Sequence, residues 1–335
     1  MKYINGYIIK IYNWIIGRKF INKNNLFCRR IRAILYHNIC YECNATFGNK
    51  NADRKFYLIR CSQAEMGLFA VLNYIIYHLK CAEELGEEPV IDWQHYPNKY
   101  ILEDYEIGKV NAWEYFFEKV SDIDLNDLYK SKNVHMSSGS WEIPGNEIFD
   151  KNKLWYSHEI WTKYIQLNAE LNSRLDIEKE RLGFNDYRIL GVKCRGTDFI
   201  KARPIGHTIV PDIEMTIETI NRKIEEWGAF DKIYLSTEDE SIFKLLKDNY
   251  GNKLCYLEER RIILDTTEWL SEMYDRREVN NEICKKEDMT NYLIETYLLA
   301  ECDALIAPQV GGTLGAMRIR GRYDYEYIFQ LGVYK

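Results

Sequence analysis

The second half of the sequence alternates short apolar runs with amphipathic segments, and this alternation restricts the fold more than any other feature. The apolar runs predict five strands, at residues 188–193, 232–236, 253–256, 304–307 and 327–329. Segments with apolar residues at helical spacing lie between them, at residues 211–227, 242–246 and 290–301 and after residue 313. Strands that alternate with helices form a parallel sheet covered by helices. We therefore expect a doubly wound α/β domain that binds its ligand at the carboxyl ends of the strands.

The first half begins with the same pattern. Residues 56–61 predict a strand, residues 68–79 a helix that ends at Gly86, and residues 89–93 the next strand. This order again predicts a parallel sheet. Farther along, one long helix with charged faces is expected over residues 154–182.

Length and composition fit two globular domains. The chain has 335 residues, and we place an N-terminal segment at 1–50, a first domain at 51–185 and a second at 186–335. Apolar residues make up 46% and charged residues 29%, as in ordinary globular proteins. The net charge of -6 argues against general binding of nucleic acid. No apolar run reaches the ~18 residues that a membrane span needs.

The nine cysteines are spaced irregularly. Cys40 and Cys43 form a Cys-x-x-Cys pair, but no second pair of Cys or His stands at the spacing of a zinc finger. We therefore expect reduced thiols in a cytoplasmic protein.

The N-terminal segment is basic. Residues 1–41 contain eight Lys and Arg residues and no Asp or Glu, with Trp and Ile among them at roughly helical spacing. A signal peptide would need a longer apolar core and a cleavage site of small residues. The segment is either an ordinary basic surface helix or a peripheral attachment to an anionic membrane surface.

Charged residues follow the strand predicted at 188–193. Lys193, Arg195 and Asp198 surround Gly196 at the point where the strand ends. Arg can bind two phosphate oxygens at once, and Gly lets the backbone approach a ligand closely. The alternative is an Arg–Asp pair in a surface loop.

Two other strand ends would lie at the same edge of the sheet. Residues 236–239 read Ser-Thr-Glu-Asp and could instead cap the following helix. Residues 308–313 read Pro-Gln-Val-Gly-Gly-Thr before a helix, and the free N–H groups of a helix N-terminus bind anions. A glycine turn at this place is also common without a ligand. Together the three ends supply a cation, carboxylates and a loop suited to phosphate.

These stretches resemble a known family. Residues 191–198, His207, residues 236–239 and residues 302–306 look like the donor domain of the α-1,6-fucosyltransferase group, which is related to the protein O-fucosyltransferases. The resemblance covers residues 185–333. It implies a GT-B fold, with two Rossmann-type parallel-sheet domains that face a cleft. It also implies an inverting, metal-independent transfer from a GDP-sugar, for which fucose is the leading sugar.

The resemblance also implies roles for individual residues. Arg195 matches the Arg that binds the diphosphate, and Glu295 stands where the family has a carboxylate that reads guanine. Asp198 is the first candidate for the catalytic base and His207 the second, although Asp198 could orient Arg195 and His207 could cap a helix. The expected nucleotide-sugar site consists of Lys193, Arg195, Thr237, Glu238, Asp239, Glu295, Gly311, Gly312 and Thr313. Neither a cofactor nor a metal is expected.

The sequence departs from the family at several of these positions. Lys193 replaces a His, and Gly196 replaces a second Arg. Residues 310–313 replace a Ser-rich loop, and Arg203 stands where the family has an acidic candidate base. The donor could therefore be another nucleotide sugar, or the protein could bind a nucleotide or sugar without catalysis.

The first domain is expected to bind the acceptor, a glycan or a lipid-linked oligosaccharide. Five aromatic residues could stack on its sugars or lie buried in the core: Trp93, Tyr96, Trp113, Tyr115 and Trp141. The expected setting is bacterial surface polysaccharide assembly, in the cytoplasm or peripherally on the inner face of the membrane.

Overall fold

The structure is a computed structural model that describes residues 42–60, 66–95, 100, 108–139, 142, 144–196, 203, 205–259, 261 and 285–335. Contacts divide the chain into two compact units. Unit 1 comprises Met1–Pro144 with Lys163–Asn168, and unit 2 comprises Gly145–Thr162 with Ala169–Lys335. The basic segment at residues 1–41 lies outside the described residues. Among the described residues, no helix is long and apolar enough to cross a membrane.

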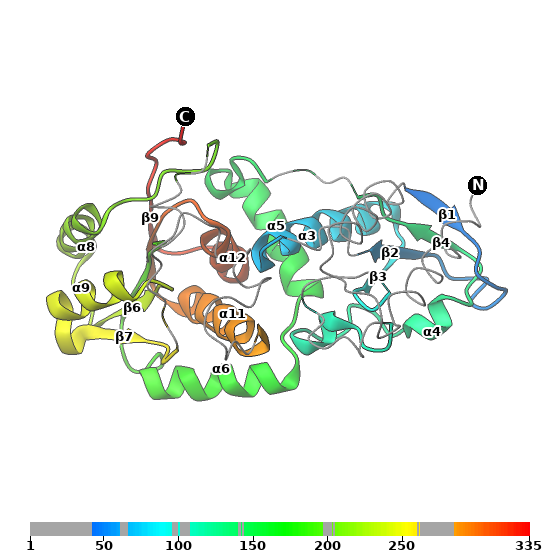
Figure 1. The fold of residues 1–335 in the computed structure, drawn as a ribbon, viewed down its shortest axis with the longest axis horizontal. Coiled ribbons are helices and arrows are strands. Elements are labelled where there is room, and N and C mark those ends of the chain that lie inside the picture. The colour runs from blue at the N-terminus through cyan, green and yellow to red at the C-terminus, as the bar shows by residue number, and fades with distance from the viewer. Residues whose placement is uncertain are drawn as a thin grey trace, which may run out of the picture. The chain divides into compact units, whose positions relative to one another are not determined.

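Unit 2 contains the five parallel strands that the sequence predicts (Figure 1). Their order is β7-β6-β5-β8-β9, and each neighbouring pair is parallel. The strands are β5 (Ile189–Lys193), β6 (Lys232–Ser236), β7 (Leu254–Tyr256), β8 (Ala304–Ala307) and β9 (Tyr325–Ile328). This order confirms the doubly wound α/β fold of the unit.

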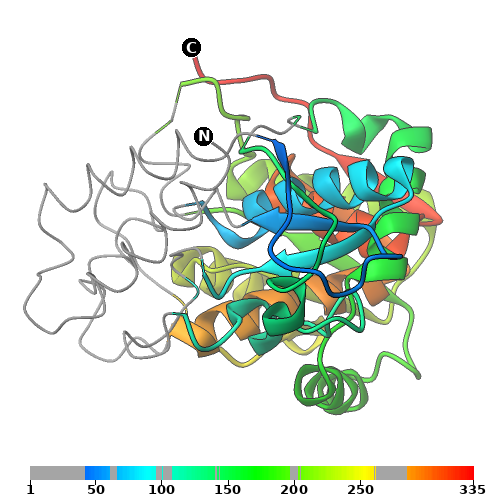
Figure 2. The same cartoon turned by 90° about the vertical axis from the view of Figure 1, so that its right-hand side faces the viewer.

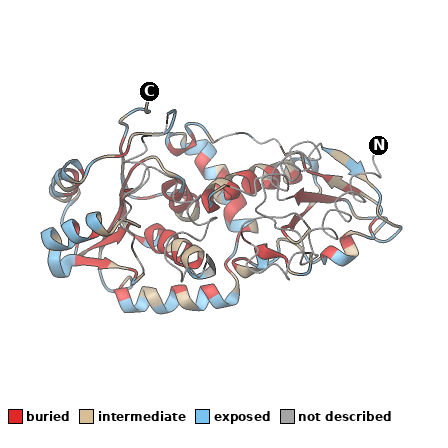
Figure 3. Ribbon diagram, in the orientation of Figure 1, coloured by how far each residue is buried: buried red, intermediate tan, exposed pale blue. Residues whose placement is uncertain are grey.

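Helices cover both faces of this sheet. The helices α8 (Ile213–Trp227) and α9 (Glu240–Tyr250) pack on one face, where Leu190 and Val192 join their apolar side chains in a core. The helices α11 (Lys285–Glu301) and α12 (Gly311–Arg320) lie on the other face. The strands β5, β6, β7 and β8 are mostly buried, whereas the edge strand β9 is exposed to half-buried, and α8 and α9 expose much of their outer surfaces (Figure 3). A short helical turn, η4 (Gly251–Lys253), leads into β7.

The long helix expected over residues 154–182 is wrong. Two helices occupy this stretch, α5 (Lys151–Tyr164) and α6 (Ala169–Leu182). The residues between the two helices belong to unit 1 and pair with its backbone. The N–H of Glu118 donates to the carbonyl of Gln166, and the N–H of Asn168 donates to the carbonyl of Phe116. These bonds replace those that a continuous helix would make. Figures 1 and 2 show α6 at the outside of unit 2, where it packs on α11.

The unit boundary differs from the boundary placed at residue 185. Both α5, up to Thr162, and α6 group with unit 2. A turn, η3 (Glu147–Phe149), precedes α5. Glu147 forms a buried bidentate ion pair with Arg318 of α12, at 2.8 and 2.9 Å, which ties this segment to the C-terminal unit.

Two helix starts also differ from the predictions. The helix expected over 211–227 begins at Ile213, because Asp212 is the N-cap and accepts a hydrogen bond from the backbone N–H of Met215. The helix expected over 290–301 begins earlier, at Lys285, so that Thr290 lies inside α11.

Unit 1 contains a smaller sheet with the order β1-β4-β2-β3. Its strands are β1 (Cys43–Ala45), β2 (Phe56–Arg60), β3 (Glu88–Asp92) and β4 (Val134–Met136). As predicted, β2 and β3 are parallel; β4 is parallel to β2, and β1 is antiparallel to β4. The strand β1 therefore belongs to the sheet, although its residues were placed in the N-terminal segment.

The helix α3 (Leu68–Leu85) packs on one face of this sheet and ends at Gly86, whose left-handed backbone (φ 63°) suits glycine. The other face packs against α4 (Leu125–Leu128). A turn, η2 (Ala112–Tyr115), lies in the aromatic stretch after β3.

Candidate functional site

Arg195 and Glu238 form an ion pair at the carboxyl ends of β5 and β6. An Nη of Arg195 lies 3.0 Å from an Oε of Glu238. The same carboxylate accepts the backbone N–H of Gly196 at 3.0 Å. Burial alone would raise the pKa of Glu238, but the charges of Arg195 and Lys193 hold it below its ordinary value. Glu238 is therefore ionised and holds the guanidinium at the end of β5.

Gly196 lies directly against Asp239. A Cβ built on Gly196 would collide with the side chain of Asp239. Asp239 cannot easily move, because it is the N-cap of α9 and accepts the backbone N–H groups of Ser241 and Ile242. This confirms the capping alternative for residues 236–239 and explains why an Arg does not fit at position 196. Thr237 is fully buried and accepts the N–H of Asp239 at 3.2 Å.

Lys193 lies buried two residues before Arg195 on the same strand. Its ammonium donates to Ser236 Oγ at 2.9 Å and lies 3.8 Å from Glu295 on α11. Ser236 Oγ also donates to Glu295 Oε2 at 3.1 Å. Burial alone would lower the pKa of Lys193, but the carboxylates of Glu295 and Glu238 raise it above its ordinary value. Lys193 therefore carries its charge inside the protein.

Glu259, which follows β7, meets Glu295 in the same network. Burial and the charge of Glu295 raise the pKa of Glu259 to about 10. Oε1 of Glu295 is buried and has no hydrogen-bond partner among the described residues. Because its raised pKa keeps Glu259 protonated at neutral pH, the hydroxyl of Glu259 can donate to the carboxylate of Glu295.

The third predicted strand end leads from β8 into α12. Val310 is the N-cap of α12 and makes no side-chain capping bond. Gly312 lies against Tyr292, since a Cβ there would stand 2.9 Å from the tyrosine hydroxyl. The ring of Tyr292 in turn faces the Lys193 ammonium at 5.4 Å. Thr313 Oγ1 is buried with no hydrogen-bond partner among the described residues. The helix therefore presents an uncapped N-terminus with an unpaired hydroxyl in its first turn.

The three strand ends are thus joined through one buried network. Because β5 lies between β6 and β8, Arg195 stands between the acidic turn and the α12 N-terminus. A guanidinium and backbone N–H groups at one sheet edge can bind an anion such as a diphosphate. Among the described residues, no group of three or more His, Cys, Asp or Glu side chains could hold a metal ion.

The structure describes only one of the two predicted base residues. Asp198 lies outside the described residues. His207 is exposed in the turn before α8, and its carbonyl accepts the N–H of Tyr334 at 2.9 Å. Arg203 is exposed with a left-handed backbone (φ 44°).

Two of the five aromatic residues proposed for the acceptor are core residues. Trp93 and Trp113 are fully buried, with ring centroids 5.5 Å apart, and Tyr100 stacks on Trp93 at 4.9 Å. Tyr115 is half-buried. Tyr96 and Trp141 lie outside the described residues.

Sequence reasoning missed Glu259 and Tyr292. The contact of Tyr292 with Lys193 depends on packing between α11 and β5, which leaves no local signal in the sequence. A carboxylate soon after the strand that ends at Tyr256 was the one available signal for Glu259, since strand ends collect functional side chains in this fold.

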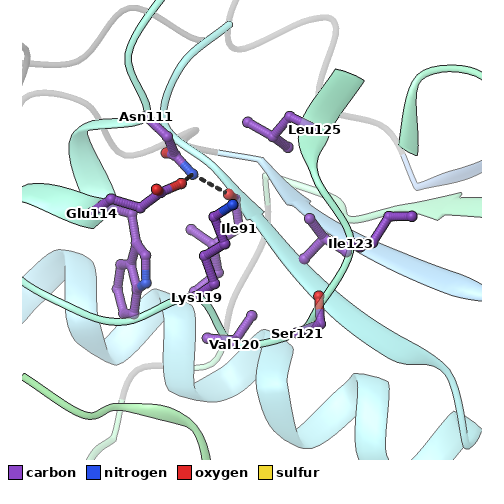
Figure 4. Close-up of a pocket in the computed structure, with 10 residues that line it drawn as sticks. Ile91, Asn111, Glu114, Lys119, Val120, Ser121, Ile123 and Leu125 are labelled. Atoms are coloured by element: carbon purple, nitrogen blue, oxygen red, sulfur yellow. Dashed lines mark hydrogen bonds between the residues drawn. The ribbon is translucent and has the colours of Figure 1, made fainter. Parts of the chain in front are cut away.

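Unit 1 contains a hollow beside its edge strand β3 (Figure 4). It has an open volume of about 290 Å³ and is lined by Val90, Ile91, Asn111, Trp113, Glu114, Lys119, Val120, Ser121, Ile123 and Leu125. The amide of Asn111 donates to the carbonyl of Ile91 at 3.0 Å and to Glu114 at 3.3 Å. These hydrogen bonds fix the side chain of Asn111 between two other residues that line the hollow, Ile91 and Glu114.

The fold defines a protein with two Rossmann-like α/β units, and the strand edge of the second unit has groups that could bind an anion. No family profile matches the sequence, and no curated protein matches it. Among solved structures, the chain is similar to NodZ α-1,6-fucosyltransferase soaked with GDP-fucose: 18% identity, TM-score 0.47, covering 79% of this chain and 93% of that one. A NodZ structure from Bradyrhizobium matches at 17% identity and TM-score 0.47, covering 78% and 92%.

Two other fucosyltransferase structures are similar over comparable lengths. POFUT1 in complex with GDP matches at 10% identity and TM-score 0.43, covering 84% of this chain and all of that one. A mutant of Arabidopsis thaliana FUT1 with GDP matches at 10% identity and TM-score 0.46, covering 96% and 77%. Because these TM-scores lie below 0.5, the fold assignment depends on the strand order and register of the chain itself.

Proposed function

We propose that the protein is an inverting glycosyltransferase that moves a sugar, with fucose the leading candidate, from a GDP-sugar to a glycan acceptor. One observation carries the proposal: Arg195 stands at the end of β5, and the neighbouring strand β8 leads into the uncapped N-terminus of α12. Such an edge suits the diphosphate of a nucleotide sugar.

The reaction develops negative charge on the leaving diphosphate as the acceptor oxygen bonds to the anomeric carbon. Arg195 can bind two diphosphate oxygens, and the N–H groups of Gly311 and Gly312 can bind others. Lys193 supplies a buried positive charge behind them, held by Ser236 and Glu295. These groups together can stabilise the charge without a metal.

Recognition of guanine by Glu295 stays a prediction. Glu295 is 3% exposed and lies 3.8 Å from the ammonium of Lys193, so an ion pair could equally explain its presence. If Glu295 reads guanine, Glu295→Gln weakens GDP by roughly 1–3 kcal/mol and leaves the weaker UDP unchanged, because uracil lacks the N1–H and 2-amino pair. If Glu295 serves the ion pair alone, calorimetry shows equal losses for both nucleotides.

A second candidate function is favoured by the pairing of Arg195 with Glu238, which competes with a phosphate for the guanidinium. It is nucleotide or sugar binding without catalysis. Nucleotide release from GDP-, UDP-, ADP- and CMP-sugars, with and without EDTA, separates the candidates. The proposed transferase releases GDP from GDP-fucose in both conditions. Binding without release of any nucleotide supports the second candidate, and a preference for another donor corrects the sugar nucleotide.

We further propose that unit 1 binds the acceptor, a glycan or lipid-linked oligosaccharide, and that the protein serves bacterial surface polysaccharide assembly. The basic composition of residues 1–41 supports peripheral attachment to the cytoplasmic face of the membrane.

A further inference from the structure

His135 of β4 joins two carboxylates that come from different parts of unit 1. Its Nε2 lies 2.8 Å from Oε1 of Glu42, and its Nδ1 lies 2.8 Å from Oε2 of Glu87. Glu42 directly precedes β1, and Glu87 stands in the turn between α3 and β3. The side chains of His135 and Glu87 are 13% and 15% exposed, whereas that of Glu42 is 57% exposed. The imidazole thus connects the residue before the edge strand β1 to the turn that follows α3.

The two bonds together require the charged form of the imidazole. An ionised carboxylate only accepts hydrogen bonds, so each ring nitrogen must donate one. The neutral ring carries one N–H, whereas the imidazolium carries two. When His135 loses its proton, a lone pair therefore faces one of the carboxylates. We expect Glu42 to separate, because its side chain is the more exposed and water can take the place of the imidazole.

Other titratable groups surround these side chains, on α3, on β2 and after β4: Tyr57, Tyr77, His78, Cys81, Glu84 and Glu142. The ring of Tyr57 meets that of His135 edge-on, with centroids 4.8 Å apart. Burial raises the pKa values of Tyr57, Tyr77 and Cys81, so these groups stay neutral at ordinary pH. Nδ1 of His78 lies 2.9 Å from the Tyr57 hydroxyl. Since histidine ordinarily changes its charge between about pH 5 and 8, His135 and His78 are the groups to compare in this range.

The strand β1 has few other contacts that hold it. It has three residues at the edge of the sheet, and among the described strands it pairs with β4 alone, where Asn44 lies opposite His135. Cys43 and Ala45 are only partly buried against the core. Such short edge elements open locally at a small cost in free energy. A bond from Glu42 to His135 therefore matters for the attachment of β1.

We propose that Glu42, His135 and Glu87 form a pH-sensitive clamp, which fastens β1 while the imidazole is charged and releases it when the imidazole becomes neutral. Residues 1–41, with eight basic residues and no acid, join the sheet through Glu42. The clamp therefore fixes the point at which the basic segment leaves the sheet, more firmly in mildly acidic than in alkaline solution. The inference does not depend on the proposed transferase function.

Hydrogen exchange of the backbone amides of residues 43–45 tests the clamp. Mass spectrometry of the full chain measures it from about pH 5.5 to about pH 8.5, with each rate divided by the intrinsic rate at that pH. We expect the protection of these amides to fall on the order of three- to tenfold over this range, because one hydrogen bond to a charged group is lost. The protection of residues 56–60 in β2 should stay constant, which separates local release of β1 from global unfolding.

Three variants assign the effect to the clamp. In His135→Gln, the protection of β1 should no longer change with pH, because the side chain does not titrate. Glu42→Gln removes the charge of the exposed arm and should lower the protection of β1 at the acidic end alone. Glu84→Gln removes the same charge from an exposed position on α3 outside the clamp, and it should behave as wild type.

Two outcomes would overturn the clamp. In the first, the protection of β1 in wild type does not vary with pH or is absent throughout. In the second, His135→Gln or Glu42→Gln keeps the pH dependence of wild type, which would assign that dependence to another group such as His78.

Discussion

Lys193 and Glu295, each 3% exposed, lie 3.8 Å apart beneath the end of β5. Both charges are removed from water. Each is stabilised instead by the other charge and by a hydrogen bond with the hydroxyl of Ser236. The pair lies behind the strand ends at which we place the diphosphate.

Removing one partner of this pair should be costly. We expect Lys193→Met to lower the free energy of unfolding by about 3–5 kcal/mol, because the carboxylate of Glu295 remains buried without its cation. Urea denaturation measures the loss. In Lys193→Met combined with Glu295→Gln, part of the loss should return, which a double-mutant cycle reports as a coupling energy. Strictly additive single losses would show that the two charges do not interact.

The proton on Glu259 should make stability depend on pH. The pKa of Glu259 is raised from 4.5 to about 10 in the folded protein, so the folded state holds a proton that the unfolded state has released. Wild-type stability from this group is therefore complete below pH 4.5 and falls as the pH rises toward 10. Glu259→Gln keeps a donor for Glu295 and has no proton to lose. Its stability relative to wild type should increase from pH 4.5 to pH 8, and a constant difference would show that Glu259 is ionised throughout.

Arg195→Lys tests the bidentate contact with the diphosphate. The substitution keeps the charge but loses the planar fork, and we expect turnover of GDP-fucose to fall on the order of 10²-fold or more. The melting temperature should change little. Arg222→Lys is a matched control, since Arg222 is exposed and pairs with Glu226 on the same helix. Near-normal turnover of Arg195→Lys would show that the residue is peripheral to the reaction.

The basic N-terminal segment predicts salt-dependent attachment to anionic lipid, at ~1 kcal/mol for each basic residue near the surface. In co-sedimentation, the full chain should bind vesicles that contain phosphatidylglycerol at low salt and leave them at high salt. A chain without residues 1–41 should not bind. Equal binding to neutral and anionic vesicles, or binding to neither, would contradict this prediction.

Most strands of the fold could be predicted from the sequence, because buried parallel strands are nearly continuous apolar runs, as in residues 189–193 and 304–307. The helix over 154–182 was wrong because bonds from residues 166 and 168 to residues 116 and 118 interrupt it. Such long-range pairing leaves no local signal. The start of α11 was also misplaced. The helix was expected from residue 290, but it begins at Lys285, in a polar stretch without apolar periodicity.

The sequence predicts that the three strand ends meet at one edge of the sheet, because parallel strands end at the same edge. It does not predict which side chains at these ends are buried. The sequence presents Lys193 and Arg195 as equivalent cations, whereas the structure buries the first and pairs the second with Glu238.

Calorimetry of the full chain with GDP and with UDP shows whether the protein binds a guanine nucleotide. We expect that GDP binds, that UDP binds at least about tenfold more weakly, and that Arg195→Lys weakens GDP binding while Arg222→Lys does not. Tighter binding of UDP than of GDP, or no binding of either nucleotide, would contradict this expectation.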